Sequence, residues 1–265
     1  MLFRSAFERD FTFSNEVNNT ALIGRGFTLN NSTMTVENGI LRLEKDARVI
    51  LNNSTMDIGD NVTVIFEQGS KLDMCPNSVL IVGNNVTFKT ENGDSCQGIV
   101  LMGNNRNSVT FNNATFQKVP VTINNTQVDY NGCTFSKSNV RHNNESLSIN
   151  YCDFDFCGIQ VIQTLPDREE QCLVQNSSFN NSTETGIQIT GYPRVIVLNN
   201  NIQYNYSGIE LYECSKGEVT NNEISYNGNG ILIYHSNVCV TGCNKITYNY
   251  RGSPAGDARG GNGID

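Results

Sequence analysis

The sequence predicts an all-β solenoid, in which the chain winds through short parallel strands and advances by one coil about every 22 residues. The string Asn-Asn-Ser-Thr-Met occurs at residues 30–34 and again at 52–56, a step of 22. The pair Gly-Ile keeps the same step, beginning at residues 186, 208 and 230. Within each repeat, apolar and polar residues alternate in most segments, as over 209–211, and a period of two is typical of strands. These three observations together favour a stack of about ten to eleven coils.

Each repeat supplies three strands separated by short corners. In one repeat, apolar residues alternate over 195–197, 202–204 and 209–211, with asparagine or glycine between these segments. No segment shows the three-and-four spacing of an amphipathic helix. Each strand is therefore expected to hydrogen-bond to its equivalent in the next coil, about 4.8 Å away.

Residues that recur at every 22nd position are predicted to stack on themselves. The columns are Asn200, Asn222 and Asn244; Asn205, Asn227 and Asn249; Ile202, Ile224 and Ile246; and Tyr204, Tyr226 and Tyr248. Asparagine side chains about 4.8 Å apart can hydrogen-bond along such a column, which explains the excess of asparagine, 40 of 265 residues. The isoleucines should line the core, and the tyrosines, which share their phase, are predicted to form a stacked core or corner ladder.

Residues 199–211 (NNNIQYNYSGIEL) and 221–233 (NNEISYNGNGILI) match the generic repeat N-N-x-I-x-x-N-x-x-G-I-x-L. In this motif the sequence resembles the right-handed parallel β-helix family of the pectin-lyase-like superfamily. The resemblance covers residues 29–265 and implies a right-handed, single-stranded parallel β-helix, with 1–28 as an N-terminal cap or entry segment. Lyases, glycoside hydrolases, epimerases, phage spikes and non-catalytic adhesins share this fold, so the resemblance alone implies no single activity.

The spacing is looser between residues 100 and 186, where insertions are expected to lengthen the corners. Phenylalanines predict one inward column there: Phe116, Phe135, Phe154 and Phe179. Two longer insertions are predicted at 163–172 and 251–263. The chain then stops at Asp265, one residue after another Gly-Ile pair. We therefore expect a β-helix truncated at its C-terminal end, with the remainder of a longer polypeptide beyond it.

The nine cysteines form no C-x-x-C pair, which disfavours zinc and thioredoxin-type sites. Cys133 and Cys152 each precede a phenylalanine of the inward column by two residues and are expected to fill the core. Cys157 and Cys172 flank an insertion and are the best candidates for a disulfide.

Charge and hydropathy exclude two kinds of partner. The net charge is −8 and no run of lysine or arginine occurs, which argues against nucleic acid. No segment reaches the length of about 18 apolar residues that a membrane helix needs, so no membrane insertion is expected. The acidic, polar composition and the resemblance favour an exported protein, extracellular or at the cell surface, whose signal segment is not present in this chain.

Two carboxylates on one predicted strand are the first candidate site. Asp153 and Asp155 alternate with phenylalanines, so both should point outward, about 7 Å apart. Such a pair could begin a calcium site or take part in acid–base catalysis. Calcium needs six to eight oxygen ligands, and the aligned neighbours add hydroxyls and amides but no carboxylate. A solvated polar face without cofactor is the favoured interpretation, with calcium as the alternative.

A second candidate cluster combines acid, base and cation within two coils. It contains Glu210, Glu213 and His235, with the basic Arg194 and Lys216 nearby. A catalytic or ligand-binding role for these residues competes with the interpretation that they form ordinary surface charge pairs.

Tyr212 and Tyr234 are predicted to be exposed one above the other, where a glycan ring could bind, although the chain contains no tryptophan. Mostly short corners disfavour catalysis, because a catalytic cleft needs walls that exclude water. The favoured function is a rigid spacer, adhesin-like or glycan-binding module, with a polysaccharide or cell-surface glycan as partner. The alternatives are a polysaccharide lyase, glycoside hydrolase or epimerase with a groove on the β-helix face, and a phage fibre or tailspike-type protein.

Overall fold

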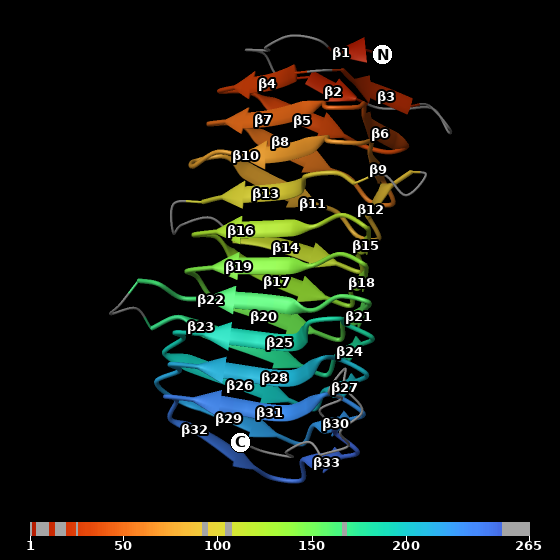
Figure 1. Ribbon diagram of the computed structural model, residues 1–265. Coiled ribbons are helices and arrows are strands. Elements are labelled where there is room, and N and C mark those ends of the chain that lie inside the picture. Colours follow the sequence, from red (N-terminus) through yellow and green to blue (C-terminus); the bar gives the residue numbers. More distant parts are fainter. Residues whose placement is uncertain are drawn as a thin grey trace. The chain divides into compact units, whose positions relative to one another are not determined.

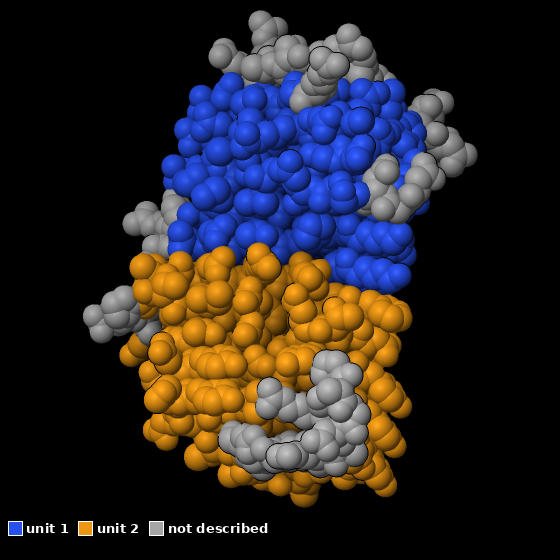
Figure 2. All heavy atoms as spheres, in the orientation of Figure 1, with its two compact units in different colours: residues 1–138 blue, residues 139–265 orange. Residues whose placement is uncertain are grey.

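The computed structural model describes residues 2–3, 11–13, 20–24, 26–91, 95–103, 108–165 and 169–250. Most of the expected cap 1–28 and the whole insertion 251–263 lie outside the described residues. The chain divides into two compact units, unit 1 (residues 1–138) and unit 2 (residues 139–265), which Figure 2 shows in separate colours. The described ranges contain strands and no helix, so no helix there could span a membrane.

In both units, parallel strands stack in register (Figure 1). In unit 1, sheet A contains β1 (Leu2–Phe3), β3 (Thr20–Ile23), β6 (Ile40–Leu43), β9 (Thr63–Phe66), β12 (Thr87–Thr90), β15 (Thr115–Gln117) and β18 (Thr134–Ser136). Its sheet B contains β4 (Gly26–Asn30), β7 (Arg48–Asn52), β10 (Lys71–Met74), β13 (Gly98–Met102) and β16 (Val121–Asn124). Its third face consists of sheet C, with β2 (Phe11–Phe13), β5 (Thr33–Val36), β8 (Thr55–Ile58) and β11 (Val79–Val82), and of β14 (Ser108–Asn112) and β17 (Gln127–Asn131) in sheet D.

Unit 2 has three faces. Sheet A contains β21 (Asp153–Asp155), β24 (Ser178–Asn180), β27 (Asn201–Gln203), β30 (Glu223–Ser225) and β33 (Lys245–Thr247). Sheet B contains β19 (Val140–Asn143), β22 (Ile159–Ile162), β25 (Thr185–Thr190), β28 (Ser207–Tyr212) and β31 (Asn229–Tyr234). Sheet D contains β20 (Leu147–Asn150), β23 (Gln171–Gln175), β26 (Arg194–Leu198), β29 (Gly217–Thr220) and β32 (Val238–Thr241).

The strand register confirms the predicted solenoid. Ile187 pairs with Ile209 between β25 and β28, and Ile209 pairs with Ile231 between β28 and β31, so each coil advances by 22 residues there. In unit 1, Leu29 pairs with Leu51 at the same step. Within the described residues sheet B contains ten strands, which agrees with the lower bound of the predicted range of coils.

The core of each unit is built from the inward residues of its strands. In unit 1, Phe116 and Phe135 stack with ring centroids 4.6 Å apart, and in unit 2 Phe154 and Phe179 stack at 4.5 Å. All four rings are fully buried, which confirms the predicted inward phenylalanines within each unit. The parallel-strand spacing of about 4.8 Å lies within the range at which aromatic rings pack favourably, so register and ring stacking reinforce each other.

The two predicted asparagine ladders of unit 2 are present. Asn200 donates through Nδ2 to Oδ1 of Asn222 at 3.0 Å, and Asn222 donates in the same way to Asn244 at 3.1 Å. The second ladder repeats this geometry from Asn205 through Asn227 to Asn249. The ladder side chains also donate to main-chain carbonyls, so each satisfies backbone groups that a corner would otherwise leave unpaired.

Asparagine has a second role at the corners, where the backbone turns through positive φ. Among the described residues of unit 2, positive φ occurs at Asn144, Tyr151, Phe156, Asn176, Asn181, Gly191, Asn199, Tyr204, Glu213, Asn221, Tyr226, His235, Gly242 and Tyr248. Asparagine and glycine tolerate this left-handed conformation better than other residues. The excess of asparagine thus reflects both buried ladders and exposed corners.

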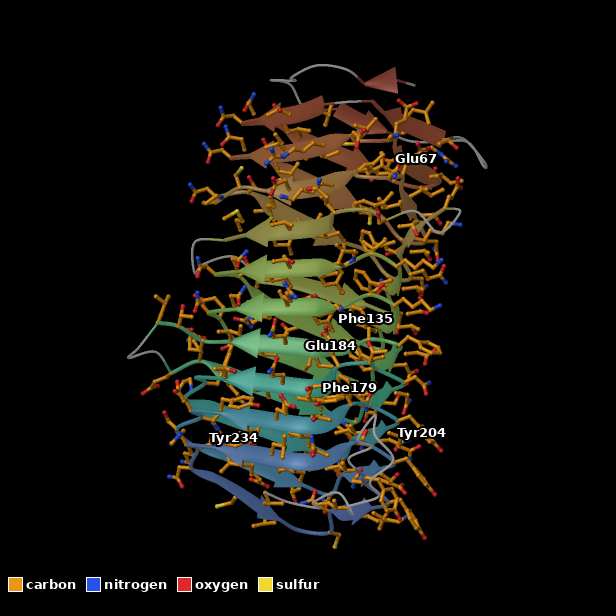
Figure 3. All side chains as sticks on the ribbon, in the orientation of Figure 1. Glu67, Phe135, Phe179, Glu184, Tyr204 and Tyr234 are labelled. Carbon is orange, nitrogen blue, oxygen red and sulfur yellow. The ribbon has the colours of Figure 1, made fainter. Side chains whose placement is uncertain are left out.

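Tyr204, Tyr226 and Tyr248 form a corner ladder rather than part of the core. Their rings stack at 5.2 Å per step, and their side chains are 56%, 48% and 58% exposed. Figure 3 shows Tyr204 projecting away from the ribbon. Of the two predicted alternatives, core or corner, the corner is observed, because each residue has positive φ directly after a sheet A strand, which ends the inward phase of the isoleucines.

None of the nine cysteines, all of which lie in the described ranges, forms a disulfide, so the proposed Cys157–Cys172 disulfide is wrong. Cys157 precedes β22 and Cys172 lies on β23, so a whole strand of the coil separates the two buried thiols. Cys133 and Cys152 are buried as predicted.

A buried histidine in unit 2 is hydrogen-bonded within its own coil. His142 on β19 is fully buried, and its Nε2 lies 2.8 Å from the carbonyl oxygen of Glu145, to which it must donate. The Tyr192 hydroxyl donates to the same carbonyl at 2.7 Å. In the neutral imidazole the single proton is on Nε2, and Nδ1 carries none. Within the described residues Nδ1 has no hydrogen-bond partner. A second proton would find no acceptor, and burial lowers the pKa of His142 to about 4, although Glu145 and Glu170 oppose this shift.

This histidine is expected to make the protein less stable in mild acid. The unfolded chain takes up a proton near pH 6.5, whereas the folded chain resists it down to about pH 4. Stability is therefore fully present above about pH 6.5 and is lost as the pH falls. Between about pH 7.5 and about pH 5 the free energy of unfolding should drop by about 2 kcal/mol. Urea unfolding at the two pH values measures this drop.

The chain's other histidine, His235, is exposed and serves as the control. The variant His235→Gln should keep the pH dependence and His142→Gln should lose most of it. An unchanged slope in His142→Gln would assign the acid sensitivity to carboxylates instead.

Candidate functional site

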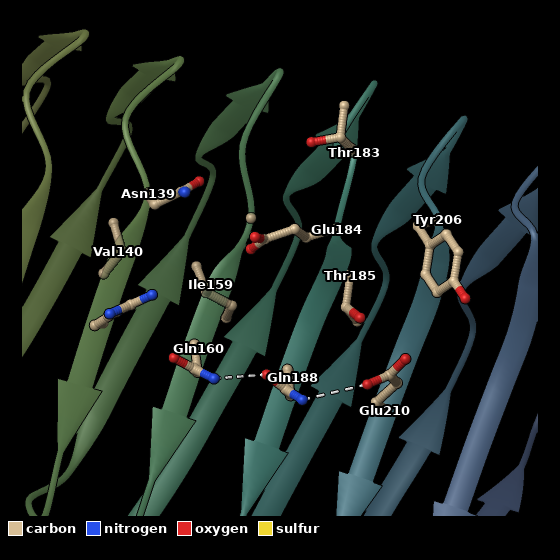
Figure 4. A pocket seen from close by; sticks show the side chains of 12 residues that line it. Asn139, Val140, Ile159, Gln160, Thr183, Glu184, Thr185, Gln188, Tyr206 and Glu210 are labelled. Atoms are coloured by element: carbon tan, nitrogen blue, oxygen red, sulfur yellow. Dashed lines mark hydrogen bonds between the residues drawn. The ribbon is translucent and has the colours of Figure 1, made fainter.

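An open groove lies on the outer surface of sheet B in unit 2, over β19, β22, β25 and β28 (Figure 4). Its volume is about 480 Å³. The lining residues are Asn139, Val140, Arg141, Gly158, Ile159, Gln160, Thr183, Glu184, Thr185, Gln188, Tyr206 and Glu210. Most of these side chains are polar, so the groove suits a ligand with many hydrogen-bonding groups.

The floor of the groove is a row of polar side chains, one from each coil. Strand register places Arg141 beside Gln160, Gln160 beside Gln188, and Gln188 beside Glu210. Gln160 Nε2 donates to Gln188 Oε1 at 2.9 Å, and Gln188 Nε2 donates to Glu210 Oε2 at 3.3 Å, as the dashed lines of Figure 4 mark. The row thus runs from a cation at Arg141 to a carboxylate at Glu210.

Glu210 is held by partners on its own strand as well as the next. The Tyr212 hydroxyl donates to Glu210 Oε2 at 3.2 Å. Burial, followed by the nearby Glu210 carboxylate, raises the pKa of Tyr212 to about 12, so this hydroxyl stays protonated at neutral pH. The carboxylate is only 8% exposed and has a fixed orientation, which suits recognition of a single hydroxyl.

One wall of the groove comes from a lengthened corner. Four residues (181–184) join β24 to β25, whereas three residues (204–206) form the equivalent corner before β28. The extra residue brings Thr183 and Glu184 to the groove, and the Tyr206 main-chain nitrogen donates to the Glu184 carbonyl at 3.1 Å. The Tyr206 side chain is 59% exposed beside this wall. The groove therefore combines charged groups with an open aromatic ring.

The structure separates the residues of the second predicted cluster. Glu210 lines the groove, whereas Glu213 and His235 are exposed corner residues with positive φ beyond the ends of β28 and β31. Arg194 begins β26 on sheet D, and Lys216 lies in the next coil, where its carbonyl accepts from the nitrogen of Val195. Within the described residues no ion pair joins members of this cluster.

Asp153 and Asp155 point outward on either side of the buried Phe154, as predicted. Both carboxylates accept hydrogen bonds from the next coil, Asp153 from Ser178 Oγ at 2.6 Å and Asp155 from Asn181 Nδ2 at 2.8 Å. These bonds account for one oxygen of each carboxylate. Within the described ranges, no group of three or more His, Cys, Asp or Glu side chains could hold a metal ion.

Tyr212 and Tyr234 stack with ring centroids 5.1 Å apart and planes at 6°. Tyr234 is exposed as predicted, whereas Tyr212 is half-buried because its hydroxyl reaches Glu210. Stacked rings turn one face toward each other, so this pair offers a ligand fewer open ring faces than two isolated tyrosines would.

Several groove residues were not predicted from the sequence, above all Arg141, Gln160, Glu184, Gln188 and Tyr206. The sequence does contain a pattern that marks the floor of the groove. Each Gly-Ile pair at 158, 186 and 208 is followed by Gln or Glu, the outward residue of a sheet B strand. The wall has no such signal, because the extra corner residue looks like ordinary variation in repeat length.

Comparison with known proteins agrees with this architecture. A family model described as the right-handed beta helix region matches residues 121–264, more than half of the chain and nearly all of unit 2. No curated protein and no solved structure matches the chain. The parallel solenoid, its 22-residue step and its asparagine ladders are consistent with this match. The chain therefore belongs to the right-handed β-helix family.

Proposed function

We propose that unit 2 binds carbohydrate in the groove on sheet B. The observation that carries this proposal is the row Gln160–Gln188–Glu210, hydrogen-bonded along the floor of an open groove of about 480 Å³, with the exposed ring of Tyr206 beside it. Sugars present hydroxyl groups that both donate and accept, and amide side chains do the same. The Tyr206 ring adds an apolar surface for the C–H face of a sugar ring.

Rigidity supports the same proposal. The floor strands are parallel and in register, and Oδ1 of Asn200 and of Asn205 accepts from the main-chain nitrogens of Ser177 and Ser182 in the preceding coil. A site held in place before binding loses little conformational entropy when the ligand arrives, which favours affinity at an open surface. A rigid, exported, glycan-binding module at the cell surface is the role that we propose for the chain.

The variant Tyr206→Ala is expected to weaken glycan binding by about tenfold, because it removes the open ring of the groove. The experiment screens the purified protein on an array of neutral and acidic glycans, then measures Kd for the tightest-binding glycan by calorimetry. Tyr204→Ala is the matched control: Tyr204 lies two residues away with a similar exposure of 56%, but outside the groove.

Equal losses in both variants would place the ligand elsewhere, and an array without any signal would contradict the proposed function. Product analysis on each retained glycan separates binding from catalysis. Cleavage would favour the polysaccharide-acting enzyme and direct attention to Glu184 and Glu210.

A further inference from the structure

The row of polar side chains on the groove floor has a direction, because one end of it can only accept hydrogen bonds. The row consists of Arg141, Gln160, Gln188 and Glu210, which strand register places in successive coils. An ionised carboxylate only accepts hydrogen bonds, whereas an amide side chain has an NH2 group on one side and a carbonyl oxygen on the other. Gln188 therefore has to turn its Nε2 toward Glu210, and the two atoms lie 3.3 Å apart.

The orientation of Gln188 determines the orientation of the next amide. With Nε2 toward Glu210, Gln188 turns Oε1 back toward the preceding coil, where this oxygen accepts from Gln160 Nε2 at 2.9 Å. Gln160 in turn directs its own Oε1 away from Gln188, toward the coil of Arg141. The reverse arrangement would set Gln188 Oε1 against the Glu210 carboxylate, with no proton between two acceptors. The order of donors and acceptors on the floor thus follows from one carboxylate.

The residues at the two ends of the row favour the same direction. Beyond Glu210, strand register places Leu232, an apolar residue whose side chain offers the carboxylate no competing hydrogen bond. Tyr212 donates to Glu210 Oε2 at 3.2 Å and so also uses the carboxylate as an acceptor. At the opposite end, Arg141 lines the same groove and carries only donors, which suit the oxygen that Gln160 turns toward its coil.

We infer that Glu210 is a positioning residue, which acts through Gln188 and Gln160 and gives the groove a fixed order of donors and acceptors. This inference rests on the proposed glycan-binding function and adds to it the orientation of the bound glycan. An oligosaccharide has two chemically different ends, and its hydroxyl, ring and linkage oxygens follow one another in a fixed order. A floor with one direction matches that order in one orientation, with acceptors of the ligand at Arg141 and donors of the ligand toward Glu210.

The first test uses the free protein and the variant Glu210→Gln. A glutamine at this position can donate as well as accept, so the row should lose its fixed direction and both orders should coexist. Nuclear magnetic resonance of the isotope-labelled protein follows the side-chain amide signals of Gln160 and Gln188, which are assigned by substituting each residue in turn. Both sets of signals should shift or double. Gln160 is decisive, because it lies two coils from the substitution, where a merely local disturbance would not reach.

Glu218→Gln is the matched control for this experiment. Glu218 is an exposed residue of β29, outside the groove, and its substitution removes the same charge. It should leave the side-chain signals of Gln160 and Gln188 unchanged, and urea titration checks that both variants are folded. Unchanged Gln160 signals in folded Glu210→Gln would overturn the inference.

The second test uses the array glycan that binds the wild-type protein most tightly, prepared as an oligosaccharide with a nitroxide at its reducing end. In the wild type the nitroxide should broaden the main-chain amide signals at one end of the row only, either at Arg141 or at Leu232. In Glu210→Gln it should broaden both ends. Kd should rise about tenfold in Glu210→Gln and less than about twofold in Glu218→Gln. Broadening at both ends in the wild type would refute the single orientation.

The outcomes separate this inference from the proposed function. A weaker affinity of Glu210→Gln with unchanged Gln160 signals would give Glu210 a direct ligand contact only and refute its positioning role. If no array glycan binds the wild-type protein, the proposed function fails together with the orientation of the ligand. In that case the amide signals of the free protein still decide whether Glu210 sets the direction of the row.

Discussion

The variant Ile224→Asp is expected to show no cooperative unfolding transition at neutral pH. Ile224 is fully buried on β30 and pairs in register with Ile202 and Ile246. Its Cγ2 atom also lies within 2.9 Å of the position that a Cβ of Gly208 would take, so the site has no room for water around a carboxylate. An unpaired buried charge costs several kcal/mol or more, comparable with the whole stability of a typical domain, about 5–15 kcal/mol.

Far-ultraviolet circular dichroism and urea titration of the purified variant provide the measurement. Gln203→Asp is the control, because Gln203 is an outward, half-buried residue in the preceding coil of the same sheet. It introduces the same charge and should change the free energy of unfolding by less than about 1 kcal/mol. A folded Ile224→Asp protein with a normal transition would show that the isoleucine column does not face the core.

The variant Asn222→Asp is expected to lose about 4 kcal/mol of stability. Asn222 Nδ2 donates to the carbonyls of Val197 and Thr220 at 3.0 and 2.9 Å, and to Oδ1 of Asn244 at 3.1 Å. An aspartate keeps the shape but turns an acceptor toward these three acceptors, and each buried group left unpaired costs about 1–3 kcal/mol. The Asn222 side chain is 1% exposed, so water cannot replace the lost donors.

The adjacent residue provides a matched control for the ladder. Asn221 is an exposed corner residue with φ 55°, and its Oδ1 accepts from the nitrogen of Cys243 at 3.2 Å. Asn221→Asp makes the same chemical change and keeps that acceptor, so the free energy of unfolding should fall by less than about 1 kcal/mol. Similar losses in the two variants would mean that the ladder contributes no more than a surface amide.

The architecture follows from two properties of the repeat unit, its alternation of apolar residues and its length. Period-two alternation requires strands, and the 22-residue step requires each strand to meet its own equivalent, because only this pairing keeps every apolar residue inside. The ladders of Asn200 and Asn205 followed from the same step, since identical side chains one strand spacing apart can bond to one another. The inward positions of Ile224 and Phe179 followed for the same reason.

Other features depended on how the corners turn. Positive φ at Tyr204 turns its ring outward although its phase predicts the core, and alternation does not encode this change. The intervening strand β22 similarly keeps Cys157 and Cys172 in separate parts of the coil although they flank an insertion in the sequence. Corner geometry depends on one or two residues in each coil, so the repeat pattern of the strands does not predict it.

The sequence by itself determined the solenoid, its coil length and its ladders, and it identified Glu210 as an outward carboxylate. Only the tertiary structure decided that Glu210 belongs with Gln160 and Gln188 in one groove, and that the exposed ring of Tyr206 lies beside them. The physical reason is that residues on the inner face of a strand must be buried, and this requirement is the same in every coil. Residues on the outer face have no such common requirement. A site on that face depends on which side chains happen to stack from coil to coil.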